Sequence, residues 1–396
     1  MTNVYVDPTA KAVGNGSQTH PYNSWSEVSF TAGNTYLQKA GTTASGVLYE
    51  TANNVTISSY GSGSAPHLNG LIDLVGASHV TVQNLTIQNP TGAGIAIQSG
   101  ANNITINDDT ITKSAFGIWI GNGAGGGNLI THSNISGNSE DGIGISQAAV
   151  GSSIIDNTVS NNGWYGIDID GDNFTVSGNT VDGNGLAIPG TSGIHVYGGA
   201  PGAPDGFGIG NTITDNITNG NHDATAFDGN GIELDQYTHN NVVLGNTAED
   251  NDGAGIAVYD SYDDNVIGNL LISNEQDPGR SHAAMGELAL NESEGDTYDN
   301  YIAANVAIST SHSSAVFMDF ISYDDSNAFS DNTWENLSTG SATQIGIDTS
   351  WADWLSFAPT DQNGGISLTA APLLAGTLDY DAIAQMYSTI LAREIS

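Results

Sequence analysis

The sequence contains no cysteine, and only five of its 396 residues are lysine or arginine. The lack of cysteine excludes disulfides and thiol chemistry. The scarcity of bases, set against 43 acidic residues, leaves a formal net charge of −38. Nucleic acids and anionic membranes are therefore unfavourable partners, because their phosphates would be repelled. A polyanionic glycan would need a bridging cation for the same reason.

Long apolar runs are missing as well. No stretch of about 18 apolar residues is present, so no segment is expected to span a membrane. Residues 1–7 lack the basic region and apolar core of a signal peptide. An acidic, Cys-free chain rich in Gly, Asn and Asp suits type I secretion, so we expect a secreted or cell-surface protein. The alternatives are a cytosolic protein, or one whose signal peptide has been removed.

What is abundant is glycine, with 51 residues, and a repeated Gly-Ile pair. The pairs begin at positions 94, 117, 142, 166, 193, 231 and 255, so their spacings are 23, 25, 24, 27, 38 and 24. A period near 24 with two or three strands per repeat indicates a solenoid, in which each thin coil must stack on its neighbours. The alternatives, a β-propeller or a β-sandwich, have longer or less regular repeats.

Asparagine recurs between the Gly-Ile pairs, for example at Asn157, Asn179 and Asn246. Asparagine tolerates left-handed backbone, and its amide can bond to the same residue of the next coil. We therefore predict asparagine ladders at the turns of an all-β fold. The predicted architecture is a single-stranded right-handed parallel β-helix with an N-terminal cap and a short C-terminal helix.

Three segments are expected along the chain. Residues 1–50 form an N-terminal cap or leader, because the first coil would otherwise expose strand edges and core. Residues 51–345 form the β-helix, and residues 346–396 a closing segment. Residues 378–395 carry Ile383, Met386, Tyr387, Ile390 and Leu391, the apolar stripe of an amphipathic helix.

The strand after each Gly-Ile pair places the most chemistry on one outer face. Because alternate strand residues point to opposite faces, Ile, Val and Leu face the core there. The two outward positions after each pair form two columns. The first holds Trp119, Asp168, His195 and Glu233, and the second Asp170, Tyr197, Asp235 and Tyr259. Stacked like charges are destabilising, so they call for a functional reason.

Asp168, Asp170, Glu233, Asp235 and His195 are the candidate catalytic residues. Glu233 and Asp235 should lie about 6–7 Å apart on one strand, and carboxylates two coils apart about 9–10 Å. Inverting glycosidases need about 6.5–9.5 Å between their carboxyl groups, and retaining enzymes about 5–5.5 Å, so the spacing favours inversion. Clustered carboxylates also raise one another's pKa, which can create a general acid.

Long insertions flank this face at residues 186–190, 198–210, 221–230 and 275–285. We expect them to wall a groove, since binding residues often lie in loops on a rigid scaffold. The candidate substrate-binding residues are Trp119, Tyr165, Tyr197, Tyr237, Tyr259, Asp260, His222, Arg280 and His282. The aromatic rings would offer flat faces to sugar rings, and the alternative is that half of them are simply packed.

Calcium is the main alternative role for the acidic residues. Asp168, Asp170 and Asp172 follow one another at alternate positions, and hard carboxylate oxygens suit Ca²⁺. The remaining alternative is a solvated surface. No cofactor is required if the site hydrolyses a glycosidic bond.

These features resemble those of the carbohydrate-active right-handed β-helix superfamily. Its members include pectate and alginate lyases, mannuronan C5-epimerases, and glycosidases of the polygalacturonase and tailspike kind. The resemblance rests on the repeats, on the leader phrase from Gly14 to Tyr22, and on the tail with Trp334, Trp351 and Trp354. The Asn-Thr-Asp, Asp-Asp and Gly-His-Gly set of polygalacturonases is not found together.

One stretch, from Tyr165 to Asp170, looks like the Tyr-Gly-x-Asp-Pro-His motif of mannuronan epimerases. Tyr165 and Asp168 match it, whereas Asp170 stands where that family has histidine. The resemblance implies a fold and a carbohydrate substrate rather than one reaction.

We therefore expect a glycoside hydrolase with a carboxylate acid–base pair, acting on a polysaccharide or oligosaccharide. A Ca²⁺-assisted lyase or C5-epimerase acting on a uronate polymer through Tyr165 or Tyr197 with His195 is the first alternative. A non-catalytic glycan-binding or adhesive protein is the second. The sugar, the linkage and the oligomeric state are left open.

Overall fold

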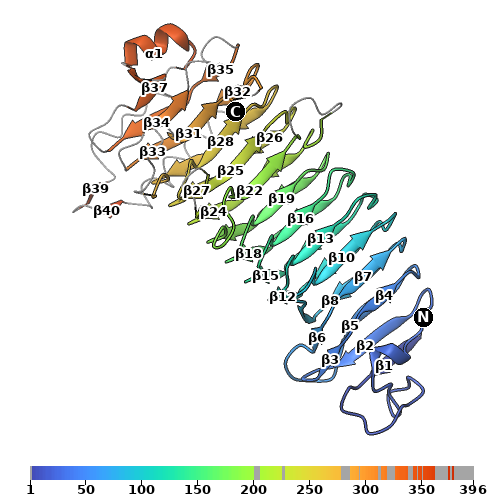
Figure 1. The fold of residues 1–396 in the computed structure, drawn as a ribbon. Helices are drawn as coiled ribbons and strands as arrows, with labels where there is room; N and C mark the ends of the chain where they lie inside the picture. Colours follow the sequence, from blue (N-terminus) through green and yellow to red (C-terminus); the bar gives the residue numbers. More distant parts are fainter. Residues whose placement is uncertain are drawn as a thin grey trace. The chain divides into compact units, whose positions relative to one another are not determined.

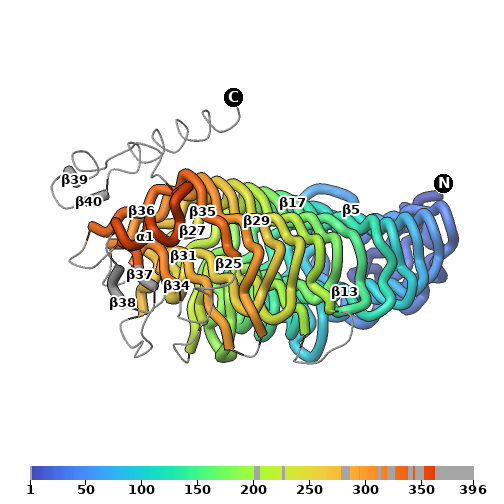
Figure 2. Tube along the Cα trace, turned by 90° about the horizontal axis from the view of Figure 1, so that it is seen from above, coloured from blue at the N-terminus to red at the C-terminus, as the bar shows by residue number. Residues whose placement is uncertain are grey.

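The computed structural model describes residues 2–199, 206–224, 228–277, 286–293, 295–310, 314–318, 326–337, 342–345, 347–349, 351–361, 373–374 and 377–378. Two compact units divide the chain, Met1–His195 (unit 1) and Val196–Ser396 (unit 2). Each unit is built from parallel strands that stack in register, and Figures 1 and 2 show the successive turns of the chain. The parallel β-helix expected from the repeat is confirmed.

Three parallel sheets make up unit 1. The first contains β1 (Asn3–Val6), β2 (Thr35–Lys39), β5 (Thr56–Tyr60), β8 (Thr81–Gln83), β11 (Thr105–Asn107), β14 (Leu129–Thr131), β17 (Ser153–Ile155) and β20 (Thr175–Ser177). The second contains β3 (Thr43–Ser45), β6 (His67–Asn69), β9 (Thr86–Gln88), β12 (Thr110–Thr112), β15 (Asn134–Ser136), β18 (Thr158–Ser160) and β21 (Thr180–Asp182). The third contains β4 (Leu48–Glu50), β7 (Ile72–Val75), β10 (Ile95–Gln98), β13 (Ile118–Ile120), β16 (Ile143–Ile145), β19 (Ile167–Ile169) and β22 (Ser192–Tyr197), in which unit 1 ends.

Unit 2 repeats the same three-sheet plan. Its first sheet contains β23 (Thr212–Thr214), β26 (Val242–Leu244), β29 (Asn265–Ile267), β32 (Tyr301–Ala303) and β35 (Ala328–Ser330). Its second contains β24 (Ile217–Asn219), β27 (Thr247–Glu249), β30 (Leu270–Ile272), β33 (Val306–Ser309) and β36 (Thr333–Asn336). Its third contains β25 (Asn230–Asp235), β28 (Ile256–Tyr259), β31 (Gly286–Asn291), β34 (Ser314–Met318), β37 (Thr343–Ile345) and the antiparallel β38 (Ile347–Thr349). β39 (Leu373–Leu374) and β40 (Thr377–Leu378) form a separate antiparallel pair.

Aliphatic side chains from the strands of all three sheets fill the interior of each coil. In the coil of β11, β12 and β13, the inward residues Ile106, Ile111 and Ile118 are all fully buried. Their register partners in the next coil, Ile130, Ile135 and Ile143, continue the same stacks. Burial of each such side chain contributes about 1.5–3 kcal/mol, so the regular stack supplies the core that one coil lacks.

Asparagine ladders close the turns, as predicted. Oδ1 of Asn157 accepts the backbone N–H of Ser133 at 3.0 Å, and Oδ1 of Asn179 does the same for Asn157 at 2.9 Å. Nδ2 of Asn157 donates to the backbone oxygen of Ile130 at 2.9 Å. The left-handed backbone, however, belongs to the residue before the ladder position, such as Asp156 with φ 56°. The ladder residue itself provides the hydrogen bonds between coils.

Aromatic residues cover the N-terminal strands. The short 3₁₀-helix η1 (Trp25–Glu27) starts at Ser24, whose side chain accepts the N–H of Ser26. Trp25 is buried and donates its indole N–H to Oε1 of Gln38 in β2 at 2.7 Å. A capping role for residues 1–50 stays a prediction, and strands β1 to β4 also lie within this range.

The described C-terminal helix is α1 (Trp351–Phe357). After it, Asp361 ends an asparagine ladder: its Oδ1 accepts the N–H and Nδ2 of Asn332, both at 2.9 Å. Its Oδ2 accepts the indole N–H groups of Trp334 at 2.6 Å and Trp354 at 2.7 Å. The amphipathic helix predicted over residues 378–395 lies outside the described residues, apart from Leu378 in β40.

Candidate functional site

The outer face of the third sheet carries the columns predicted from the sequence. In unit 1 the register pairs Ala96 with Trp119, Trp119 with Gly144, and Gly144 with Asp168. In unit 2 Glu233 pairs with Ala257, and Asp235 with Tyr259. The predicted alternation of inward aliphatic and outward polar residues is therefore confirmed for these strands.

In unit 1 a further column, different from the two outward columns, runs beside the first of them. It consists of the residues just before each Gly-Ile pair: Ala93, Phe116, Asp141, Tyr165 and Ser192. The backbone keeps the last four stacked, since the oxygen of each accepts an N–H from the preceding coil, for example Gly117 N–H to Asp141 and Gly142 N–H to Tyr165, both at 3.0 Å. We call this column the corner column, because it lies where the second sheet turns into the third.

The centre of the site is a contact between two residues of the first column. Nδ1 of His195 lies 2.7 Å from Oδ1 of Asp168. Both side chains are largely buried, with 7 % of the His195 side chain and 17 % of the Asp168 side chain exposed. The pair therefore interacts with little screening by water.

Two aromatic rings hold the imidazole from one side. The ring of Tyr165 stacks on His195, with centroids 4.3 Å apart and planes within 3°. Trp164 stacks in turn on Tyr165 at 4.9 Å and donates its indole N–H to the backbone oxygen of Gly190 at 2.9 Å. The predicted wall loop at residues 186–190 is thus attached to the site through Trp164.

Asp141 lies beneath this cluster and is only 1 % exposed. One of its oxygens, Oδ1, accepts the N–H of Tyr165 at 3.2 Å. Burial raises the pKa of the Asp141 carboxyl well above its usual range, and the nearby charge of Asp168 raises it further. The Asp141 carboxyl is therefore harder to ionise than an exposed one, and it is too buried to contact a substrate.

Asp170 directly follows β19 and is only partly buried. Desolvation raises the pKa of its carboxyl to about 7, and the charge of Asp168 adds to that rise, while His195 opposes it. Asp168 and Asp170 are thus two carboxyl groups at alternate positions of one segment whose surroundings differ. Of the two, Asp168 makes the contact with His195, and Asp170 is the carboxyl whose pKa the surroundings raise, as a general acid requires.

Trp119 borders this cluster from the preceding coils. A Cβ added to Gly144 would lie 2.9 Å from the Trp119 indole and 3.0 Å from Oδ2 of Asp141. The indole therefore lies over the backbone of Gly144, where no side chain larger than hydrogen fits, and next to the buried carboxyl. This position confirms Trp119 as a neighbour of the acidic cluster.

The candidates Glu233 and Asp235 belong to unit 2. Glu233 is 7 % exposed and Asp235 is half-buried. Burial raises the pKa of the Tyr259 hydroxyl, and the charges of Asp260, Asp235 and Glu233 contribute to that rise, so these four residues lie near one another. Farther along the first column, Ala257, Ala289 and Phe317 are buried together with Ala254 and form an apolar cluster instead of an exposed surface.

The structure gives some predicted binding residues a structural setting. Asp260 is fully buried, and its Oδ1 accepts the N–H of Ser293 at 2.7 Å, so it holds a turn and is not accessible to a sugar. Tyr237 is half-buried, with φ 65°, in the turn of the preceding coil, and its N–H donates to the backbone oxygen of Asp260 at 2.7 Å. Burial thus argues against a direct substrate contact by Asp260.

The other predicted binding residues are more open or lie outside the description. His222 is exposed, and its Nδ1 lies 3.1 Å from Oδ2 of Asp252. Tyr197 is half-buried and packs against Phe207, with centroids 6.3 Å apart. Arg280 and His282 lie outside the described residues.

Calcium finds no ready site among the described residues. In this part of the chain, no three His, Asp or Glu side chains converge as metal ligands would. Asp172 follows Asp170 at the next alternate position, where its backbone pairs with Val150 in an isolated bridge. A Ca²⁺ role for Asp168, Asp170 and Asp172 stays a prediction, and no step of the chemistry below is assigned to the ion.

Sequence reasoning missed Asp141, although a signal for it existed. Asp141 precedes Gly142-Ile143 just as Tyr165 precedes Gly166-Ile167. Alignment of the repeats on the residue before each pair would have placed both in one column. What the repeats could not show is how deeply Asp141 is buried, with only 1 % of it exposed.

Residues 45–227 match the family described as right handed beta helix region. No curated protein sequence matches the chain. Among solved structures, the Dettilon tailspike protein is similar over 86 % of this chain and 68 % of its own, at 14 % identity and a TM-score of 0.61. The A-module of mannuronan C-5 epimerase AlgE4 from Azotobacter vinelandii is similar over 80 % of this chain and 87 % of its own, at 16 % identity and a TM-score of 0.53.

A lacto-N-biosidase of family GH136 from Eubacterium ramulus is similar over 87 % of this chain and 68 % of its own, at 14 % identity and a TM-score of 0.52. At these identities the comparisons establish the fold alone. The chain is a right-handed parallel β-helix protein, and the expected resemblance to the carbohydrate-active proteins with this fold is confirmed at the level of architecture.

Proposed function

We propose that this protein is an extracellular glycoside hydrolase whose active site is the cluster around Asp168 and Asp170. The observation that carries the proposal is the contrast between these two carboxyl groups. Asp168 is bonded to His195 at 2.7 Å, whereas desolvation raises the pKa of Asp170 to about 7. One group is suited to act as a base and the other as an acid, on the same outer face.

In this reaction the protonated Asp170 donates its proton to the glycosidic oxygen as the bond to the anomeric carbon breaks. Asp168, as the ionised partner, removes a proton from the attacking water. Alternate strand positions are about 6–7 Å apart, which lies at the lower end of the separation used by inverting enzymes. We therefore propose inversion, with His195 orienting Asp168 and with Tyr165 and Trp119 contacting the sugar.

The comparisons support the substrate class without choosing the reaction. A lacto-N-biosidase and a mannuronan C-5 epimerase both have this fold. Enzymes named for sugar chemistry of two kinds are thus built on the same scaffold, which supports a glycan as the substrate here.

A second reaction is worth testing because of one observation, the stack of Tyr165 on His195. A tyrosine and a histidine side by side are suited to remove and return the proton next to a carboxylate, the step shared by lyases and C5-epimerases acting on uronates. Only this second reaction is proposed to need Ca²⁺, since a cation would offset the negative charge of a uronate substrate.

The experiment is a panel of neutral and uronic polysaccharides incubated with the protein, with and without a chelator. New reducing ends without ultraviolet absorbance at about 235 nm indicate hydrolysis, whereas that absorbance marks the unsaturated product of a lyase. We expect hydrolysis, and a loss of about 10²–10⁴-fold in Asp168→Asn and in Asp170→Asn.

The matched control is Asp156→Asn. Asp156 also lies near a histidine, with its Oδ2 3.9 Å from Nε2 of His132, but both side chains are exposed. This variant should keep full activity. Equal activity of Asp170→Asn and wild type would overturn the assignment, and binding without any cleavage would indicate a glycan-binding protein instead.

A further inference from the structure

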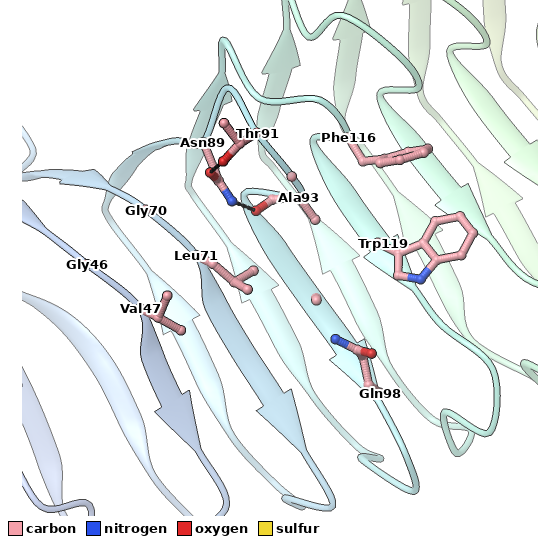
Figure 3. Close-up of a pocket in the computed structure, with 12 residues that line it drawn as sticks. Gly46, Val47, Gly70, Leu71, Asn89, Thr91, Ala93, Gln98, Phe116 and Trp119 are labelled. Atoms are coloured by element: carbon pink, nitrogen blue, oxygen red, sulfur yellow. Dashed lines mark hydrogen bonds between the residues drawn. The ribbon is translucent and has the colours of Figure 1, made fainter.

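A groove in unit 1 opens beside the proposed active site. Its volume is about 590 Å³, and it crosses the coils of β4, β7, β10 and β13. Figure 3 shows Val47 and Leu71 on the neighbouring coils, with Phe116 and Trp119 on the far side. The remaining lining residues are Gly46, Gly70, Asn89, Thr91, Gly92, Ala93, Ala96 and Gln98.

The lining is uncharged and mixes apolar surfaces with amide groups. Of the twelve described residues that line the groove, none carries a charge. Val47 is 61 % exposed and lines the groove together with Leu71. Apolar patches with a few convergent polar groups are typical of ligand sites.

The polar groups are held in fixed positions. Asn89 donates from Nδ2 to the backbone oxygen of Ala93 at 2.7 Å and accepts the Thr91 hydroxyl at 3.2 Å. Gln98 donates from Nε2 to Oδ1 of Asp73 at 2.9 Å. Their orientation is set before any ligand arrives, which reduces the entropy cost of binding.

The aromatic wall is also fixed in place. The rings of Phe116 and Trp119 lie 5.1 Å apart and tilted by 51°. The indole lies over two glycines, because a Cβ on Gly121 or on Gly144 would come within 2.9 Å of it. A rigid indole over flat backbone is well suited to lie against the apolar face of a sugar ring.

The groove continues into the acidic cluster along the same two columns. Ala96 and Trp119 precede Gly144 and Asp168 in the first column, in unbroken register. Phe116 precedes Asp141 in the corner column, and the N–H of Gly117 donates to the oxygen of Asp141. With coils about 4.8 Å apart, Trp119 lies two coils, or about 10 Å, from Asp168.

We propose that this groove binds uncharged sugar residues of the same glycan chain that is cleaved at Asp168 and Asp170. The inference rests on the proposed function for the position of the cleaved bond. An uncharged occupant follows from the lining, because no cation there can pair with a uronate and the whole chain carries a net charge of −38. The glycan then runs along the column direction, with Trp119 next to the cleaved linkage and Val47 at the far end.

The test measures binding of neutral hexasaccharides of glucose, mannose, xylose and N-acetylglucosamine by calorimetry, with hexagalacturonate as the charged comparison. The Asp170→Asn variant is used so that cleavage does not interfere. We expect at least one neutral hexasaccharide to bind, and Trp119→Ala to weaken it at least about tenfold, as loss of a central aromatic contact does. Binding of the disaccharide of the same sugar should be unaffected by a change at the far end of the groove.

Val47→Asp makes that change at a side chain that is 61 % exposed, so folding is not at risk. This variant should weaken binding of the hexasaccharide at least about tenfold and leave binding of the disaccharide unchanged. The matched control is Val13→Asp, at a position that is 55 % exposed and outside the groove, which should bind as wild type does.

The outcomes separate this inference from the proposed function. If the wild-type protein binds a neutral hexasaccharide but cleaves nothing, and both Val47→Asp and Trp119→Ala weaken that binding, the groove is supported and the hydrolase is overturned. Cleavage with an unchanged KM in both variants overturns the groove and leaves the hydrolase standing. Binding of hexagalacturonate alone, or of no hexasaccharide at all, overturns the uncharged occupant.

Discussion

Nδ1 of His195 lies 2.7 Å from Oδ1 of Asp168, one coil away in the same outer column. If Asp168 is ionised, as the proposed base must be, its carboxylate can only accept a hydrogen bond, and Nδ1 is then the donor. The Tyr165 ring, 4.3 Å from the imidazole, fixes the plane in which this bond is made. The contact therefore orients the carboxylate that we propose as the base.

Replacement of His195 by phenylalanine should separate the hydrogen bond from the stack. His195→Phe keeps a flat ring against Tyr165 and removes the donor to Asp168. We expect kcat to fall by about 10²-fold with little change in KM, because the base loses its orientation and not its sugar contacts. The control is His132→Phe, which removes the exposed imidazole near Asp156 and should change neither constant.

The pH dependence of the reaction should report Asp170. A general acid must be protonated, and desolvation raises the pKa of this carboxyl to about 7. The protonated fraction falls as the pH rises through 7, so kcat/KM should decline above that value. A pH–rate profile from about pH 4 to 9 measures it. A rate that still increases between pH 7 and 9 would remove Asp170 from the role of acid.

Tyr165→Phe should distinguish the two proposed reactions. The variant keeps the ring that stacks on His195 and deletes only the hydroxyl. If the enzyme is a hydrolase, the rate should change by less than about fivefold, because no proton passes through Tyr165. A lyase or epimerase that uses the hydroxyl would lose about 10²–10⁴-fold instead. Assays of both product types on the same variant decide between them.

The asparagine ladder should contribute measurably to stability. In Asn157→Ala, the buried N–H of Ser133 and the oxygen of Ile130 lose a partner 3.0 and 2.9 Å away. Two unsatisfied buried groups cost about 1–3 kcal/mol each, so the free energy of unfolding should fall by about 2–6 kcal/mol. Urea unfolding measures it, with Asn134→Ala at an exposed position of β15 as the control. A similar loss in both variants would contradict the ladder's role.

Stability should also depend on pH, because one ladder position holds a buried carboxyl group instead of an amide. Asp109 stands where other coils have Asn157 and Asn179, and burial raises the pKa of its carboxyl to about 8. The folded state thus binds a proton that the unfolded state has released, so stability falls as the pH rises from about 4 towards 8. One oxygen, Oδ2, is buried without a hydrogen-bond partner, whereas Oδ1 accepts the N–H of Leu85 at 2.8 Å.

Asp109→Asn should therefore stabilise the protein at pH 8 and have little effect near pH 4. The amide keeps the acceptor for Leu85 and removes the buried charge. Denaturation curves at several pH values measure the difference, and the control is Asp108→Asn at the exposed neighbour, which also has positive φ. Equal effects of both substitutions at pH 8 would show that general charge reduction, and not burial, is responsible.

Much of the fold could be predicted because it depends on local pattern. Side chains alternate between the two faces of a strand, so the Gly-Ile repeat alone is enough to place Trp119, Gly144 and Asp168 in one column. Ladder asparagines such as Asn157 are predictable for the same reason, since a turn that recurs at one period brings identical residues together.

The active site is less completely predictable. The repeat places Asp168, Asp170 and His195 on one face, and the structure brings Asp168 and His195 into contact. The same pattern makes Glu233 and Asp235 catalytic candidates at least as strong as these three, and it does not point to Asp141. A repeat gives the column of a residue, but it does not give the depth of its side chain below its neighbours.

The sequence by itself determined the coil and the order of residues along each outer column, because these follow from short-range alternation and a nearly constant period. Only the tertiary structure decided which of those residues act together. The Trp119 indole lies over Gly144 beside Asp141, and the Tyr165 ring lies over His195. Such coverage sets the local dielectric, and therefore which carboxyl group holds a proton, and it depends on side chains from separate coils that no single repeat contains.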